Sequence, residues 1–180
     1  MSQDIIQRPE PAEYAPYFET YVSKVENGDV LAILRAQVEQ TAVLLSEIGE
    51  SGAGFRYQEG KWNVKELVGH LIDTERIMVY RAVSFARGER TTLPGFDEDE
   101  YVRQARFSAR SLDSLVDELR AVRASTLPFF AGLDAEELMR AGTANNRPYT
   151  VRALAFIVGG HERHHVQVLR DRYLPALRSR

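Results

Sequence analysis

The stretch Asn63-Val-Lys-Glu-Leu-Val-Gly-His-Leu-Ile-Asp-Thr-Glu-Arg-Ile-Met78 decides the fold class of this chain. It begins with a residue that can cap a helix, and a glutamate follows three positions later, which is the spacing of a capping box. Its apolar residues then recur every three or four positions, so they share one face of an α-helix. The pattern predicts an amphipathic helix that ends at Gly88 and carries His70 on its buried face.

Three other segments show the same spacing of apolar residues. They run from Asp29 to Gly52, from Ser111 to Pro128, and from Thr150 to Pro175. We expect glycines, beginning with Gly49, to end the first of them and the prolines to kink or stop the other two. The chain is therefore predicted to be an all-α four-helix bundle.

The rest of the chain connects these helices within one predicted domain, residues 1–180. Residues 1–27 contain three prolines and are predicted to be an N-terminal arm. The turn-rich, acidic segment 93–100 is a long connection between the second and third helices, and we expect it to be a lid or a crossover. Residues 134–139 are predicted to form a short helix, and residues 144–148 a turn.

Composition narrows the classes of function. The net charge is −3 with both signs interspersed, so the chain lacks the basic surface that binds nucleic acid. No stretch approaches the ~20 apolar residues of a membrane span, and the N-terminus does not resemble a secretory signal. We therefore expect a cytoplasmic protein with no membrane or nucleic-acid partner. The absence of cysteine restricts any metal site to nitrogen and oxygen ligands.

The four histidines of the chain lie on two of the predicted helices. His161 and His165 are four residues apart, so both imidazoles project from one side of a helix. His70 lies on the buried face of another helix, and metal sites in bundles are assembled from such facing side chains. The pattern predicts a metal site of His70, His161 and His165. His164 is the alternative to His165, or a pocket residue, and we favour His165.

Other interpretations of these residues stay open. A single histidine is more often a core or surface residue with ordinary hydrogen bonds. The string from His161 to His165 also fits the zincin pattern H-E-x-x-H, with Glu162 as general base. The fifteen residues after His165 contain neither histidine nor glutamate, which argues against a peptidase. We expect Glu162 to be exposed or salt-bridged. Asp73 is a candidate fourth ligand, although a hydrogen-bond acceptor is the better interpretation.

Three segments of the chain resemble the DinB-like superfamily of metal-dependent enzymes, which is unrelated to the DNA polymerase of similar name. They are residues 61–77, the loop 93–97, and residues 160–165. The resemblance implies an up-and-down bundle whose metal ligands are one histidine on the second helix and an H-x-x-x-H pair on the last. It also implies a divalent ion, zinc or nickel, and often a homodimer.

The resemblance implies a small-molecule enzyme but leaves the reaction open, and no catalytic residue is identified. Because characterised members of the superfamily mainly handle low-molecular-weight thiols, the resemblance makes it the leading hypothesis that the metal activates such a thiol, which attacks an electrophilic small molecule. The alternative within enzymes is a hydrolase that uses a metal-bound hydroxide. A third possibility is a metal-binding protein without turnover, since a closed coordination shell would make the site inert.

Overall fold

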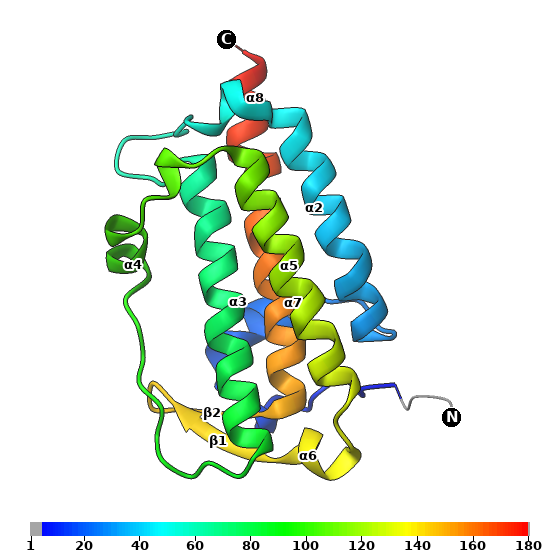
Figure 1. The fold of residues 1–180 in the computed structure, drawn as a ribbon. Coiled ribbons are helices and arrows are strands. Elements are labelled where there is room, and N and C mark those ends of the chain that lie inside the picture. Colours follow the sequence, from blue (N-terminus) through cyan, green and yellow to red (C-terminus); the bar gives the residue numbers. More distant parts are fainter. Residues whose placement is uncertain (1–4, 180) are drawn as a thin grey trace.

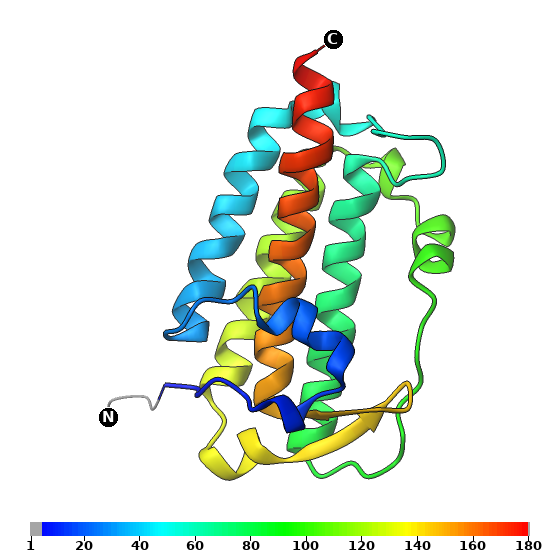
Figure 2. The ribbon, with the colours of Figure 1, turned by 180° about the vertical axis from the view of Figure 1, so that it is seen from behind.

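In the computed structural model, which describes residues 5–179, the chain forms a bundle of four long helices (Figures 1 and 2). The helices are α2 (Val30–Ala53), α3 (Val64–Ala86), α5 (Leu112–Ala131) and α7 (Val151–Val168). The predicted all-α four-helix bundle is thereby confirmed. Within the described residues, no helix combines the length and the apolar character needed to span a membrane.

The start of each long helix is fixed by a side chain that accepts a hydrogen bond from a backbone amide of the first turn. Asp29, Ser111 and Thr150 do so for α2, α5 and α7. Asn63 and Glu66 form a complete capping box at the start of α3. These contacts satisfy amide groups that otherwise lack a partner at a helix start. The predicted starts of all four helices are confirmed.

The predicted helix ends were less accurate. α2 runs to Ala53, but Gly49 is not helical, with φ 65° and ψ 173°, so the regular helix is interrupted there as predicted and a short last stretch follows across a kink. Pro175 does not stop the last helix. A π-helical turn, Leu169–Tyr173, leads directly from α7 into α8 (Leu174–Arg178), and Pro175 lies in the first turn of α8. Proline is compatible with a first turn, where its missing N–H is not needed.

The order of the helices around the bundle brings α3 next to α7. α2 packs against α5 and α7, and α3 packs against the same two helices, so α2 and α3 lie at opposite corners. Figure 1 shows that α3 and α5 run in the same direction, because the connection between them returns along the length of the bundle. This connection confirms the predicted crossover, but the shared direction of α3 and α5 departs from the up-and-down order that the resemblance implies. The connection also contains a helix that was not predicted, α4 (Glu98–Gln104), beside α3.

The predicted N-terminal arm has regular structure of its own. Within it, Pro11–Glu13 and Pro16–Phe18 form short 3-10 turns, and Glu19–Val22 forms the helix α1. α1 packs against α7, as the blue segment in front of the orange helix in Figure 2 shows. The first four residues of the predicted arm lie outside the described part of the chain. The arm is therefore part of the bundle wall, beside one of the two helices that carry histidines.

The end of the bundle opposite α8 is closed by a helix and a hairpin. The predicted short helix is α6 (Ala135–Met139). After it come two strands that were not predicted, β1 (Ala141–Ala144) and β2 (Arg147–Thr150), paired antiparallel. The predicted turn is the two-residue loop between them, Asn145 and Asn146, both at positive φ. Asparagine tolerates this conformation, which a two-residue hairpin of this type requires.

The apolar core is divided into two clusters along the bundle axis. One lies toward the hairpin and includes Phe85 and Phe156, and the other lies toward α8 and includes Leu45 and Leu115. Between them all four long helices contribute buried polar side chains. We call these residues the polar layer: Gln37, Thr41, His70, Thr74, Glu75, Arg123, Thr126, His161 and Glu162.

Candidate metal centre

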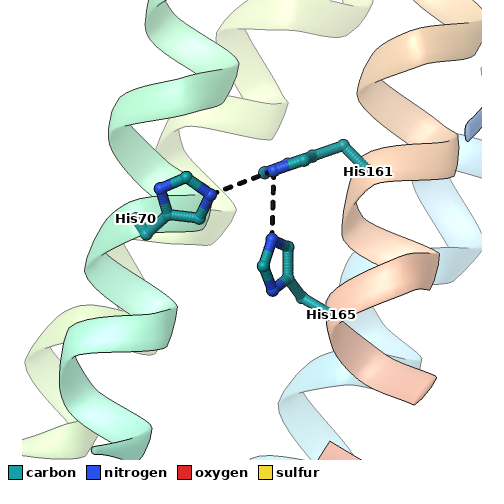
Figure 3. Close-up of side chains that lie close together, drawn as sticks. All are labelled: His70, His161 and His165. Atoms are coloured by element: carbon teal, nitrogen blue, oxygen red, sulfur yellow. Dashed lines mark hydrogen bonds between the residues drawn. The ribbon is translucent and has the colours of Figure 1, made fainter. Parts of the chain in front are cut away.

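The structure brings the three predicted histidines together (Figure 3). His70 projects from α3, and His161 and His165 project from the adjacent helix α7. The Nε2 atom of His161 lies 3.0 Å from Nε2 of His70 and 3.1 Å from Nε2 of His165. The candidate ligand atoms of all three residues lie within 4.8 Å of one another. His70 and His161 are buried, and His165 is half-buried.

Burial sets the protonation of these imidazoles. It lowers the pKa of His70 to about 4, with a smaller contribution from the charge of His164. Burial, followed by repulsion from the neighbouring histidines, also holds the pKa values of His161 and His165 well below their usual range. All three rings are therefore neutral near pH 7, so each can keep one nitrogen lone pair free. Neutral imidazole is the form that binds a metal ion.

The geometry fits a metal ion better than it fits hydrogen bonds alone. A ring nitrogen of a neutral imidazole is either a donor or an acceptor, so Nε2 of His161 cannot form good hydrogen bonds to both of its neighbours. Three nitrogens bound to one tetrahedral zinc at about 2.0–2.1 Å would lie roughly 3.3–3.4 Å apart. The observed separations of 3.0 and 3.1 Å are close to that value. A small inward-facing set of neutral nitrogen donors therefore fits a divalent ion.

Aromatic side chains surround the histidines on two sides. The ring of Trp62, just before α3, lies 4.6 Å from the ring of His70 and is stacked at 6.4 Å from His165. On the other side, the edge of Tyr21 from α1 contacts His161 at 5.3 Å and His164 at 5.6 Å between ring centroids. Sequence reasoning assigned a role to neither Trp62 nor Tyr21. Trp62 precedes the helix, so no helical spacing in the sequence indicates its stacking on the histidines. Tyr21 lies in the predicted N-terminal arm, for which no contact with the bundle was predicted.

Two residues considered from the sequence do not join the histidine cluster. His164 lies on the neighbouring face of α7, with its ring 5.0 Å from that of His165, so the preference for His165 agrees with the geometry. Asp73 is half-buried and lies 3.9 Å from the guanidinium of Arg76 on the same helix. Neither residue contributes an atom to the cluster.

Glu162 is buried, which corrects the expectation that it is exposed, although the expected salt bridge is present. Its carboxylate accepts hydrogen bonds from Gln37 Nε2 at 2.6 Å, from the Thr41 hydroxyl, and from Arg123 Nη2 at 2.8 Å. These three donors come from α2 and α5 and hold the carboxylate inside the bundle, and Glu162 does not belong to the cluster of candidate ligand atoms. Glu162 is therefore not placed to act as the general base of a zincin.

Arg123 connects Glu162 to a second buried carboxylate, that of Glu75. Arg123 Nε and Nη2 each lie 2.8 Å from a Glu75 oxygen, a bidentate arrangement, and Thr126 Oγ1 donates to the same carboxylate at 2.7 Å. Burial lowers the pKa of the guanidinium, but the charges of Glu162 and Glu75 raise it more, so the pKa lies above its usual value. Sequence reasoning missed this network, although Arg123 follows Leu119 by one helical turn and thus shares its buried face.

Comparisons with known proteins agree with this structure. The family model described as the DinB superfamily matches residues 33–169. Among solved structures, the chain is similar to YfiT from Bacillus subtilis, described as a probable metal-dependent hydrolase with an unusual four-helix bundle topology. That likeness has a TM-score of 0.68 at 15% sequence identity and covers 90% of this chain and 91% of YfiT. No curated protein matches the chain.

Proposed function

The chain belongs to the DinB superfamily, and from this premise we propose that it is an enzyme that binds one divalent metal ion through His70, His161 and His165. The observation that carries the proposal is the convergence of three neutral Nε2 atoms, with separations of 3.0 and 3.1 Å, from two adjacent helices. Zinc and nickel are the candidate ions, since both bind imidazole readily.

An ion held by three neutral ligands would supply Lewis acidity, which lowers the pKa of a water or a thiol at its remaining position. The protein contributes the surroundings. The three imidazoles would hold the ion at a fixed point, and the Trp62 and Tyr21 rings would lie beside it as apolar walls. Apolar surroundings of this kind strengthen electrostatic interactions.

We propose that the reaction is the transfer of a low-molecular-weight thiol to an electrophilic small molecule. The thiol sulfur bonds to the electrophilic carbon, the thiol proton passes to solvent, and the leaving group departs with the electrons of the bond that breaks. A thiol has a pKa of about 8.5, so an ion that lowers it suffices to form the thiolate without a general base. This choice is supported by Glu162, whose carboxylate is occupied by three donors and does not belong to the histidine cluster.

Hydrolysis is the second candidate function. It is favoured by the description of YfiT as a probable metal-dependent hydrolase. Hydrolysis would use water at the same position in place of a thiol, and a lowered water pKa of about 7 would supply hydroxide at neutral pH. A metal-binding protein without turnover is the remaining alternative. The three functions would use the same metal ligands. They differ in whether the protein transfers a thiol, hydrolyses a substrate with water, or has no turnover.

The metal site is tested by elemental analysis of the purified protein after loading with zinc or nickel. We expect about one equivalent of metal in the wild type, and little in the His70→Ala, His161→Ala and His165→Ala variants. His164→Ala is the matched control, because it removes a neighbouring imidazole on the same helix and should retain the metal. Metal retained by His165→Ala and lost by His164→Ala would show that the ligand set is wrong.

The reaction is tested by incubating the loaded protein with small thiols and an electrophile that reports conjugation. We expect turnover that a chelator removes and that returns when metal is restored. Turnover of esters or amides in the absence of thiol would instead favour the hydrolase. A loaded protein that turns over neither class would favour the non-catalytic alternative.

A further inference from the structure

We propose that Glu75 is a positioning residue of the metal centre, which acts on His161 through one buried water molecule. Arg123 binds the Glu75 carboxylate directly and binds the Glu162 carboxylate as well. The inference rests on the proposed metal site. It adds to that site the buried carboxylate of Glu75 and the cavity beside His161. It is carried by a cavity, by a free donor on His161 and by a free acceptor on Glu75.

A small cavity of about 10 Å³ lies between α3, α5 and α7. Its polar lining consists of His161, Glu162, Glu75 and Thr74, and the rest of the lining is apolar. A cavity needs about 10–15 Å³ to hold a water molecule, which also needs two to four polar partners. The cavity therefore suits a single water with partners on both helices of the metal centre.

His161 presents the donor for such a water. Its Nε2 atom faces His70 and His165, which leaves Nδ1 on the other edge of the ring. An imidazole that binds metal through Nε2 carries its proton on Nδ1, and this N–H is usually hydrogen-bonded to a carboxylate, a carbonyl or water. Within residues 5–179, no protein group forms a hydrogen bond to Nδ1 of His161. A water in the adjoining cavity would be its partner.

Glu75 presents the acceptor. Its Oε1 atom already accepts two hydrogen bonds, from Arg123 Nε and Thr126 Oγ1. Among the residues that the structure describes, its Oε2 atom accepts only one, from Arg123 Nη2 at 2.8 Å. A carboxylate oxygen has two lone pairs, so Oε2 can accept one more hydrogen bond. Glu75 lines the cavity and its side chain is only 4% exposed, so a water there is the natural donor.

The charge of the network supports the same role. Glu75 and Glu162 accept hydrogen bonds only, as ionised carboxylates do, and one guanidinium lies between them. The network thus holds two negative charges and one positive charge, and the excess negative charge is buried. Such a charge is costly unless an opposite charge lies nearby. The proposed ion, with two positive charges and three neutral ligands, would supply it across the ring of His161.

The test is the zinc affinity of three proteins, measured by competition with a chromogenic chelator. Glu75→Gln keeps the size of the side chain and removes its charge, and we expect it to weaken zinc binding about 10–100-fold, the range typical for such partners of a ligand. Thr126→Val is the matched control, since it removes one hydrogen bond to Oε1 of the same carboxylate and Thr126 does not line the cavity. We expect its zinc affinity to stay within about threefold of the wild type. Urea unfolding of each apo protein reports any general loss of stability.

The outcomes separate this inference from the metal site itself. A wild type that binds no zinc overturns both. A wild type that binds zinc with Glu75→Gln equal to it, or with Thr126→Val equally weakened, overturns only the role of Glu75. If Glu75→Gln does not fold, the role of Glu75 is tested instead with the histidine ¹⁵N–¹H NMR spectrum of the zinc-loaded wild type. We expect a slowly exchanging proton on Nδ1 of His161 with a cross-peak to water, and a deprotonated Nδ1 or no such cross-peak overturns the proposal.

Discussion

The backbone carbonyl of Tyr21 lies directly against the α-carbon of Gly160, so closely that a Cβ at position 160 would lie 2.0 Å from the carbonyl oxygen. No side chain fits into that space, so the glycine is what allows α1 to lie on α7. The contact is one residue before His161, and the ring of Tyr21 lies against His161 and His164 as a result. Glycine at position 160 thus permits the close contact that places the N-terminal arm beside the candidate metal centre.

We predict that Gly160→Ala displaces α1 and lowers the free energy of unfolding by about 1–3 kcal/mol, the usual cost of overpacking. Gly159→Ala is the matched control. Its Cβ would lie 3.2 Å from the tip of Leu34, a side chain that can shift, so the loss should be much smaller. Urea unfolding measures both. Equal stability of the two variants would show that the Tyr21 contact is not restrictive.

The single tryptophan of the chain should report metal binding. Trp62 lies 4.6 Å from His70, so nickel bound at the histidines would be close enough to quench its fluorescence. We predict a decrease in emission that saturates at one equivalent of Ni²⁺ and is reversed by chelator. The His161→Ala variant keeps Trp62 and should show no saturable decrease. Equal quenching in that variant would place the nickel elsewhere.

Much of the fold can be predicted from the sequence because its signals are local. The four helix starts depend on caps such as Asp29 and Thr150, which act within the first turn. The ends depend on longer-range packing, so Pro175 does not stop the last helix, whereas Gly49 does interrupt α2. The strands on either side of Asn145 and Asn146 have only four residues each, too few to show a period.

The apo protein should lose stability as the pH falls from about 6.5 toward 4. Histidines titrate near 6.5 when unfolded, but burial lowers the pKa of His70 to about 4 and holds those of His161 and His165 well below their usual range. The unfolded state therefore binds more protons in this window, which favours unfolding at lower pH. Each such histidine contributes up to about 1.4 kcal/mol per pH unit. Urea unfolding between pH 7 and 5, with chelator present, measures the slope.

The His70→Asn variant is the control for this pH dependence, since it removes one of the three buried imidazoles. Its slope should be smaller than that of the wild type over the same range. The effect should fade above about pH 8, where the histidines are almost entirely neutral in both states. An unchanged slope in the variant would mean that His70 does not contribute.

Arg123 and Arg120 lie on the same helix, and we predict a large loss of stability when Arg123 is replaced by methionine and a small one when Arg120 is. Arg123→Met leaves two buried carboxylates without their guanidinium, and removal of one member of a buried ion pair typically costs about 3–5 kcal/mol. Arg120 pairs with exposed Glu39 at 2.8 Å, and such pairs contribute about 0–1 kcal/mol. Thermal and urea unfolding of both variants test this difference. Similar losses would indicate that the network does not need Arg123.

The candidate site was predictable only in its most regular part. The i, i+4 spacing of His161 and His165 places both rings on one side of a helix, and His70 shares a buried stripe with Leu67 and Leu71. The environment of the histidines depends on how different helices meet. Glu75 and Arg123 are 48 positions apart and form a pair only after α3 and α5 pack together, so no local pattern announces them.

The polar layer has a consequence for how the helices are aligned along the axis of the bundle. Apolar side chains alone distinguish weakly between neighbouring registers of two packed helices. A buried, hydrogen-bonded ion pair can form in one register only. Arg123 joins α5 to a backbone carbonyl of α2, to Glu75 of α3 and to Glu162 of α7. It therefore locks the axial alignment of all four helices at the height where the imidazoles meet.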